Sequence, residues 1–253
     1  MQKLHGRVVK CLFISSKTDI GMKRSENQDR VFAEFLGDNV SIAIVCDGMG
    51  GASSGGVASQ LAIDSMVSRT KENYRVGMSE NSIRNMMLTS VHYANTVVYE
   101  NSKADIEKNG MGTTVVAALV VNKKIYVVSV GDSRAYLLNK EGIEQITTDH
   151  TYVEMLYRNG EITAEEKETH ELRNVITRAV GVEADVDVDY FELEQFGNFS
   201  VLLCSDGLSK YCTKEYIYDA VFEKDLERAA DKLIDYANES GGKDNITVAI
   251  VAN

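Results

Sequence analysis

Short apolar runs recur along the chain and predict strands that are covered on both faces. In these runs nearly every residue is apolar, often β-branched, whereas a strand with one wet face alternates apolar and polar positions. The six runs are residues 40–46, 113–121, 125–130, 135–138, 200–204 and 246–252. Residues 8–14 and 190–193 are weaker candidates, and the alternation through residues 185–189 predicts an edge strand whose acids face water.

Other segments carry apolar residues at helical spacing. Stripes at i, i+3 and i+4 run through residues 57–67, 83–98 and 226–237. Thr163 and Glu166 fit a capping box, which predicts a short helix that begins near residue 164. Strands come in pairs, then helices, then strands again. This order favours an α+β fold in which antiparallel sheets pack face to face with helices outside.

The composition narrows the class of protein. The chain has 253 residues, enough for a substantial core, and its 44% hydrophobic and 26% charged content is that of a folded globule. Its net charge of −11 argues against nucleic acid as a partner, because a grip on the phosphate backbone requires surplus Lys and Arg. No linker or low-complexity tract divides the chain, so we expect residues 1–253 to form a single domain.

Membrane insertion and disulfide bonds are not expected. The longest apolar run, residues 115–121, is far shorter than a membrane span, and no signal peptide precedes it. The four cysteines form no CxxC pair, and three of them, Cys11, Cys46 and Cys204, adjoin apolar segments. We therefore expect buried thiols in a cytoplasmic protein.

Four aspartates stand where a buried-looking strand meets a glycine-containing turn. They are Asp47, Asp132, Asp206 and Asp244. A single Asp-Gly is more often just a turn, but carboxylates that converge at strand ends raise one another's pKa unless a cation compensates them. Mg²⁺ and Mn²⁺, which prefer oxygen ligands, are the natural compensation. The pattern therefore favours a metal site.

A second constellation lies in residues 21–29. It combines Arg24 with the run Asn27, Gln28 and Asp29. An arginine held near a metal cluster can bind two oxygens of one phosphate. Taken alone, Arg24 would be an ordinary solvated surface residue.

Together these segments resemble the metal-dependent phosphatases of the protein phosphatase 2C family, in the bacterial serine/threonine form. Eight stretches occur in the family's order and span nearly the whole chain. They are GMKRSENQD (21–29), VCDGMGG (45–51), GMGTT (110–114), VGDSRAYLL (130–138), TDHT (148–151), NVITRAVG (174–181), LLCSDGL (202–208) and GGKDNITV (241–248).

The resemblance implies a four-layer αββα sandwich with a binuclear Mn²⁺ or Mg²⁺ centre at one edge. Asp47 would bridge the two metals, and the carbonyl of Gly48 would bind one of them. Asp206 and Asp244 would ligate the other. Asp132 matches the residue that, with Asp206, can hold a third, looser metal in bacterial relatives.

The resemblance also implies the remaining roles. Gln28 and Asp29 would hold the waters of the metals, and Arg24 would bind the substrate phosphate. A water activated by both metals would attack phosphorus in line with the serine or threonine oxygen. Members of the eukaryotic type carry a histidine, thought to act as general acid, where this chain has Met49, so the general acid is unassigned.

Further expectations concern the surroundings of the site. Residues 151–173 match the family's flap subdomain, and His150 is expected to brace a turn. The partners implied are phosphorylated proteins, substrates of a serine/threonine kinase, with the enzyme itself a monomer. Two alternatives stay open: a non-catalytic binding module that kept the fold, and a metallohydrolase of small phosphoesters. No cysteine begins a CxxxxxR loop, so a cysteine-nucleophile phosphatase has no candidate residue.

Overall fold

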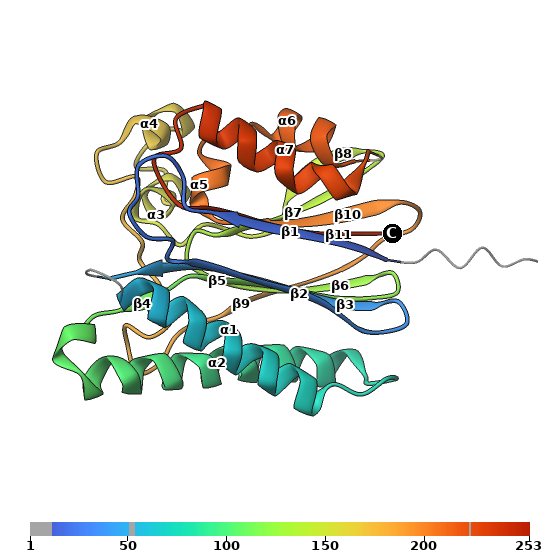
Figure 1. Cartoon of the computed structure of the whole chain (residues 1–253), viewed down its shortest axis with the longest axis horizontal. Coiled ribbons are helices and arrows are strands. Elements are labelled where there is room, and N and C mark those ends of the chain that lie inside the picture. The colour runs from blue at the N-terminus through green and yellow to red at the C-terminus, as the bar shows by residue number, and fades with distance from the viewer. Residues whose placement is uncertain (1–11, 51–53, 223) are drawn as a thin grey trace, which may run out of the picture.

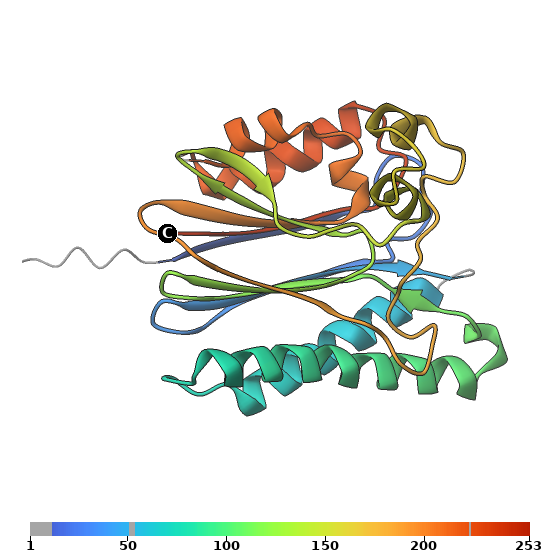
Figure 2. The same ribbon diagram turned by 180° about the vertical axis from the view of Figure 1, so that it is seen from behind.

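Two antiparallel sheets lie face to face between two layers of helices (Figures 1 and 2). The computed structural model describes residues 12–50, 54–222 and 224–253. The first sheet has the strand order β1-β11-β10-β7-β8. Its strands are β1 (Phe13–Asp19), β11 (Ile246–Ala252), β10 (Phe199–Cys204), β7 (Arg134–Asn139) and β8 (Gly142–Gln145).

The second sheet has the order β2-β3-β5-β6-β9, and a short strand, β4, pairs with the end of β3. Its strands are β2 (Asp29–Gly37), β3 (Val40–Met49), β4 (Gly112–Thr113), β5 (Val115–Val121), β6 (Lys124–Val130) and β9 (Asp189–Glu194). Every named pair is antiparallel, as expected for strands that arrive as hairpins.

Helices cover the outer face of each sheet (Figures 1 and 2). The long helices α1 (Ser54–Asn73) and α2 (Glu80–Ala104) pack on the second sheet. The helices α5 (Asp206–Ser209), α6 (Lys214–Val221) and α7 (Leu226–Glu239) pack on the first. A short 3₁₀ helix (Ile106–Lys108) follows α2, and α3 (Tyr152–Arg158) and α4 (Ala164–Thr169) lie between β8 and β9.

Alternate residues of one strand enter different apolar layers. In β3, Ile42 and Ile44 pack under α1 and α2, whereas Ala43 and Val45 pack between the two sheets. All four are at most 1% exposed. Burial on both faces explains why the central strands are apolar at nearly every position instead of alternating. The predicted αββα sandwich is confirmed.

All six predicted strands and the predicted helices are present, including the capping box of Thr163 and Glu166. In the weak candidate 8–14, residues 8–11 lie outside the described residues and β1 begins at Phe13. The prediction of a strand through 185–189 was wrong, since β9 begins only at Asp189. Val186 and Val188 pack into the layer beneath α2, so their alternation reflects anchoring of a loop.

Two expectations about the chain as a whole can be compared with the structure. Cys46, Cys204 and Cys212 are buried free thiols, whereas Cys11 lies outside the described residues. Within the described ranges, no helix combines the length and the apolar character needed to cross a bilayer.

Candidate metal centre

The strands deliver five aspartates to one end of the sandwich, on the left in Figure 1. Asp29 begins β2 and is the register partner of Asp47 on β3. Asp206 follows β10 after one residue and opens α5, and Asp132 lies in the turn between β6 and β7. Asp244 stands two residues before β11. The structure thus gathers at one edge the four acids that the sequence placed at strand ends, together with Asp29 of the segment 21–29.

Asp29 is the most enclosed of these acids. Its side chain is 1% exposed, and Oδ2 accepts a hydrogen bond from Ser205 Oγ at 2.7 Å. Ser205 Oγ in turn accepts from the backbone N–H of Thr247 at 3.0 Å, so this chain of bonds joins the two sheets. Burial raises the pKa of Asp29 to about 7, and the charges of Asp206 and Asp244 act in the same direction.

The same forces act on two neighbouring acids. Burial, followed by the charges of Asp29 and the other clustered aspartates, raises the pKa of Asp47 well above its usual range. Burial and the charge of Asp206 raise the pKa of Asp132 to about 7, although Lys210 opposes the rise. These acids therefore lack sufficient positive charge nearby, which is the condition that a bound divalent cation relieves.

Neighbouring threonines fix the backbone of Asp47. Its N–H donates to Thr114 Oγ1 at 3.0 Å, and its carbonyl accepts from Thr113 Oγ1 at 2.9 Å and from the Thr114 N–H at 2.8 Å. Thr114 Oγ1 also shares a hydrogen bond of 2.6 Å with Ser133 Oγ, next to Asp132. The GMGTT and GDSR motifs therefore brace the turns that carry the two acids.

Gly48 is required by the close approach of α1. A Cβ atom there would lie 2.1 Å from the carbonyl oxygen of Gly55 and 2.7 Å from that of Gln28. Gln28 is held in place because its carbonyl accepts from Ser59 Oγ at 2.6 Å and its N–H donates to Asn245 Oδ1 at 2.8 Å. Only glycine lets β3, the first turn of α1 and the segment before β2 meet at this point.

Arg24 binds one of the acids directly. Its guanidinium donates to Asp244 Oδ2 at 2.8 Å, and its side chain remains 55% exposed. Asn245 holds the Arg24 loop beside the acid, because its amide donates to the carbonyls of Ile20 and Glu26 at 2.9 Å each. The Asp244 carboxylate outweighs burial and raises the pKa of Arg24, so the guanidinium stays charged.

A second cation engages Asp206. Lys210 Nζ donates to Asp206 Oδ2, one helical turn away along α5. Asp206 Oδ1 is buried and has no hydrogen-bond partner, and the same holds for Asp29 Oδ1. Two buried carboxylate oxygens thus point to no donor.

The donor set suits a hard divalent ion. It consists of carboxylate oxygens, two of them buried without a partner, and a glycine carbonyl at a position where no side chain fits. As the side chains lie, however, no three acids, histidines or cysteines among residues 12–50, 54–222 and 224–253 form a group that could hold a metal ion. Two of the expected ligands, Asp206 and Asp244, are paired with Lys210 and Arg24 instead.

His150 braces the turn that carries Asp132, as the sequence predicted. Its Nδ1 accepts from the Gly131 N–H at 2.9 Å, and its Nε2 lies 3.1 Å from Asp189 Oδ2. Burial lowers the pKa of His150, which favours the neutral ring that this arrangement needs. The segment 151–173, expected to be the flap, contains α3 and α4 and begins directly after this histidine.

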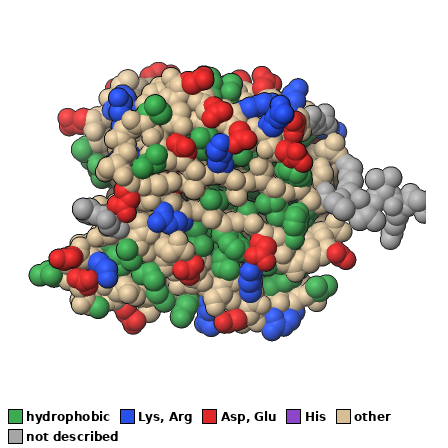
Figure 3. Space-filling model, viewed as in Figure 1, with side chains coloured by type: hydrophobic (Ala, Val, Ile, Leu, Met, Phe, Trp, Pro, Cys, Tyr) green, Lys and Arg blue, Asp and Glu red, His purple; other side chains and the backbone are tan. Residues whose placement is uncertain are grey.

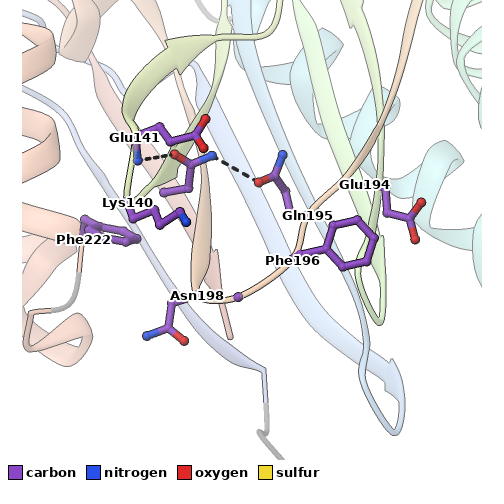
Figure 4. A pocket seen from close by; sticks show the side chains of 9 residues that line it. Lys140, Glu141, Glu194, Gln195, Phe196, Asn198 and Phe222 are labelled. Atoms are coloured by element: carbon purple, nitrogen blue, oxygen red, sulfur yellow. Dashed lines mark hydrogen bonds between the residues drawn. The ribbon is translucent and has the colours of Figure 1, made fainter.

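A cavity of about 510 Å³ lies at the other end of the strands, away from the acids. Its wall includes Lys140, Gln195 and Phe222 (Figure 4). Asn139, at the end of β7 opposite Arg134, also lines the cavity and donates to Gln195 Oε1 at 3.1 Å. Acidic and basic side chains are interspersed over the face shown in Figure 3. The groups with raised pKa values described above lie at the carboxylate edge and not at this cavity. A cluster of such groups is the usual mark of a reactive site.

Sequence reasoning missed the residues that organise the acids. Ser205, Asn245, Thr114 and Lys210 all contact the acids or the loops that carry them. Ser205 and Asn245 directly adjoin predicted acids, Thr114 lies in the GMGTT motif, and Lys210 follows a predicted acid by four residues. This proximity is the signal that the sequence carries. Their partners, however, are as much as 225 positions away in the chain.

Known proteins are similar to this chain over nearly its whole length. The family model described as Protein phosphatase 2C matches residues 22–245. Serine/threonine phosphatase stp of Listeria welshimeri is 37% identical over 236 residues, which are 93% of each chain.

Solved structures show the same fold. Serine/threonine phosphatase Stp1 from Staphylococcus aureus superposes with a TM-score of 0.89 at 34% identity, covering 100% of this chain and 99% of that one. The catalytic domain of the phosphatase PstP, in complex with two manganese ions, has a TM-score of 0.81 at 32% identity, covering 95% and 97%. The chain therefore belongs to the protein phosphatase 2C family of metal-dependent protein serine/threonine phosphatases.

Proposed function

We propose that the acidic edge is the active site, where the chain removes phosphate from phosphoserine and phosphothreonine side chains of proteins with the help of two Mn²⁺ or Mg²⁺ ions. The observation that carries this proposal is the set of five aspartates at one end of the strands. Burial and mutual repulsion raise the pKa of three of them, and two of their buried oxygens lack a donor.

The chain's own oxygens would hold the cations. Asp47 would bridge them, the Gly48 carbonyl would bind one, and Asp206 and Asp244 would bind the other; Asp132 is available for a third. When bound, these cations supply Lewis-acid chemistry, which lowers the pKa of water toward neutrality and offsets charge on the phosphoryl oxygens. The two manganese ions in the related PstP structure support this count.

Arg24 would bind the phosphate group. Its guanidinium is fully charged, half-exposed and hydrogen-bonded to Asp244, so it already lies beside one of the proposed ligands. Its planar donors can hold two oxygens of a phosphate at once. In this position Arg24 would orient phosphorus for in-line attack and stabilise the charge on the equatorial oxygens.

Gln28 and Asp29 would orient water at the site. Asp29 is fixed by Ser205, and one of its oxygens remains free to accept a hydrogen bond. Met49 packs toward Gly112, where a Cβ atom would lie 3.0 Å from the Met49 methyl carbon, and it has no proton to give. The proton that the leaving serine or threonine oxygen needs therefore comes from a group other than residue 49.

We place this reaction in the cytoplasm, with a monomeric enzyme that reverses the action of a serine/threonine kinase. The names of the relatives support phosphoproteins as substrates. Segment 151–173, with α3 and α4, would serve as the flap beside the site within a single catalytic domain of residues 1–253.

The test measures hydrolysis of a phosphothreonine peptide with Mn²⁺, with Mg²⁺ and with excess chelator. We expect turnover with metal, none with chelator, and a loss of about 10³-fold or more in Asp206→Asn, the scale of a lost metal or charge-stabilising group. Asp219→Asn, which changes an exposed acid on α6, is the matched control and should leave the rate unchanged.

Three outcomes would contradict the proposal in distinct ways. Equal rates with metal, with chelator and in Asp206→Asn would rule out the metal mechanism. Turnover of p-nitrophenyl phosphate without turnover of the phosphopeptide would favour a hydrolase of small phosphoesters. Binding of Mn²⁺ in calorimetry with turnover of neither substrate would favour a non-catalytic binding module.

A further inference from the structure

We infer that Asn95 of α2 is a positioning residue of the metal centre: it anchors a loop that holds β4 against the end of β3. The loop comprises residues 180–184, and the end of β3 carries Asp47 and Gly48. This inference rests on the metal centre proposed above. It also gives a role to the motif NVITRAVG (174–181), which the proposed mechanism leaves unused.

Asn95 is a buried amide in which both polar atoms have partners in this loop. The residue is 2% exposed. Its Nδ2 donates to the carbonyls of Glu183 and Ala184 at 3.0 Å each, and its Oδ1 accepts from the Gly181 N–H at 2.7 Å. All three partners are backbone groups. Because buried polar groups are costly to leave unpaired, these bonds hold the loop itself against the helix.

The loop lies so close to α2 that one of its residues must be glycine. Gly181 has a φ of +89°, and a Cβ atom there would lie 2.1 Å from Cγ1 of Val98. Val98 follows Asn95 by three residues, so both lie on the same face of the helix. The glycine that ends the motif therefore allows its N–H to reach the Asn95 amide.

The anchored loop also pairs with β4. The Thr113 N–H donates to the Val180 carbonyl at 3.0 Å, and the Val180 N–H donates to the Thr113 carbonyl at 2.9 Å. Both residues are inaccessible to water. Val180 and Gly181 are consecutive and are joined by a rigid, planar peptide group. A shift of the loop at Asn95 would therefore move β4 as well.

β4 in turn fixes the backbone that carries the proposed ligands. Thr113 Oγ1 donates to the Asp47 carbonyl at 2.9 Å, and Thr113 is the register partner of Gly48. Binding groups must be held within about 0.5 Å of their productive positions, so the contacts that support them affect metal affinity. The contacts from Asn95 through the loop and β4 supply such support from α2.

A purely stabilising role for Asn95 predicts a different result from a positioning role. It would lower the Tm and leave the Mn²⁺ affinity of the folded protein unchanged. The experiment is therefore calorimetric titration of the metal-free protein with Mn²⁺, well below the Tm of every variant. Asn95→Leu, which keeps the size of the side chain without its polar atoms, should bind Mn²⁺ at least about tenfold more weakly than the wild type. An affinity equal to that of the wild type would overturn the inference.

Two variants on the same helix are the matched controls. Ser90 is 2% exposed, and its Oγ donates only to a carbonyl of α2, at 2.7 Å. Ile83 is 3% exposed and lines a cavity of about 440 Å³ at the end of the strands where β3 begins. Ser90→Ala and Ile83→Ala should both keep the wild-type Mn²⁺ affinity, although Ile83→Ala should lower the Tm. An equal loss of affinity in Ile83→Ala and Asn95→Leu would show that affinity follows stability, and would overturn the inference.

Amide hydrogen exchange tests the same contacts in the metal-free protein, without Mn²⁺ or substrate. Relative to the amides of β5, the N–H groups of Gly181, Val180 and Thr113 should exchange at least about tenfold faster in Asn95→Leu than in the wild type. Acceleration at Gly181 alone would overturn the inference, because the effect would end at the loop.

Thr113→Val tests the last contact by itself and does not depend on how Asn95→Leu folds. It removes the donor to the Asp47 carbonyl and should weaken Mn²⁺ binding while leaving the exchange of the Gly181 N–H unchanged. Wild-type Mn²⁺ affinity in Thr113→Val would also overturn the inference. Failure of the proposed function gives a different result, since a wild type that binds no Mn²⁺ and hydrolyses no phosphopeptide contradicts the metal centre itself.

Discussion

The two ends of the same strands differ in how their polar side chains are satisfied. At the acidic end, Asp29 and Asp132 are nearly inaccessible to water, and burial and repulsion raise the pKa of each to about 7. At the opposite end, a cavity lies between the β7–β8 hairpin and the β9–β10 connection, with Glu141 and Gln195 in its wall (Figure 4). The polar side chain of Asn139 forms hydrogen bonds with both of these residues.

This difference affects the stability of the metal-free protein. Buried, repelling carboxylates destabilise the metal-free fold, whereas the satisfied turns of the other end do not. The shared middle of the strands is fully apolar and supports both ends. Changes at the acidic end should therefore affect stability, metal binding and catalysis together.

The largest effect should come from Gly48→Ala. The new methyl group would lie 2.1 Å from the Gly55 carbonyl oxygen, so α1 or β3 must move. We expect a loss of about 2–4 kcal/mol in the free energy of unfolding, together with weaker Mn²⁺ binding and lower turnover. Chemical denaturation, calorimetry and the phosphopeptide assay measure the three quantities.

Gly56→Ala is the control from α1, the helix whose first turn approaches Gly48. A methyl group there would meet its nearest neighbour, an Arg30 nitrogen, at 3.5 Å, which is ordinary contact. This variant should be neutral or more stable by up to about 1 kcal/mol, as expected for alanine in a helix. Equal behaviour of the two variants would show that the close approach at Gly48 has no structural role.

The sequence predicts central strands better than edge strands. The six strands predicted are the six central ones, with neighbours on both sides within their sheets. The four edge strands, β1, β8, β2 and β9, were missed or only weakly indicated. An edge strand such as β2 is half-buried over much of its length, so its side chains mix polar and apolar types without a continuous run.

The next effect concerns the pH dependence of the metal-free protein. The pKa of Asp29 is about 7 in the folded chain and about 3.9 in an unfolded one. Below about pH 4 both states are protonated, and between pH 4 and 7 only the unfolded state releases its proton. Stability should therefore fall as pH rises through this window, by up to about 4 kcal/mol for this one group, and level off above pH 7.

Urea denaturation in the presence of a chelator measures this dependence. Asp29→Asn should flatten the slope relative to the wild type, since its amide does not ionise. Added Mn²⁺ should restore stability at pH 7 and above, because the metals favour the ionised acids. A wild-type slope equal to that of Asp29→Asn between pH 4 and 7 would contradict the assignment.

The gathering of the acids at one edge was predicted better than the contacts that hold them there. An Asp that follows an apolar run and precedes a glycine is visible locally, which is why Asp47 and Asp206 could be identified. The bond from Ser205 to Asp29 spans 176 positions, and no local pattern encodes it. The pairing of Lys210 with Asp206 is local, but a lysine after a turn is too common to stand out without its buried surroundings.

The smallest effect compares one serine from each end. Ser205→Ala removes the donor to Asp29 and the acceptor of the Thr247 N–H, so two buried polar groups lose a partner. We expect a loss of about 1–3 kcal/mol in the free energy of unfolding at pH 8, where Asp29 is ionised. At pH 5, where the folded chain carries a protonated Asp29, the loss should be smaller.

Ser41 lies near the start of β3, at the opposite end of the sandwich, and its buried Oγ has no hydrogen-bond partner. Ser41→Ala therefore removes an unsatisfied hydroxyl and should leave the stability unchanged or slightly raised at both pH values. Both serines are inaccessible to water. Measuring the unfolding free energy of the two variants in parallel therefore separates the effect of a lost hydrogen bond from the effect of changing a buried side chain. Two outcomes would contradict the comparison: an equal loss of unfolding free energy in both variants, or a loss in Ser205→Ala that does not change with pH. Either would mean that the stability of the acidic end depends no more on its polar contacts than that of the other end.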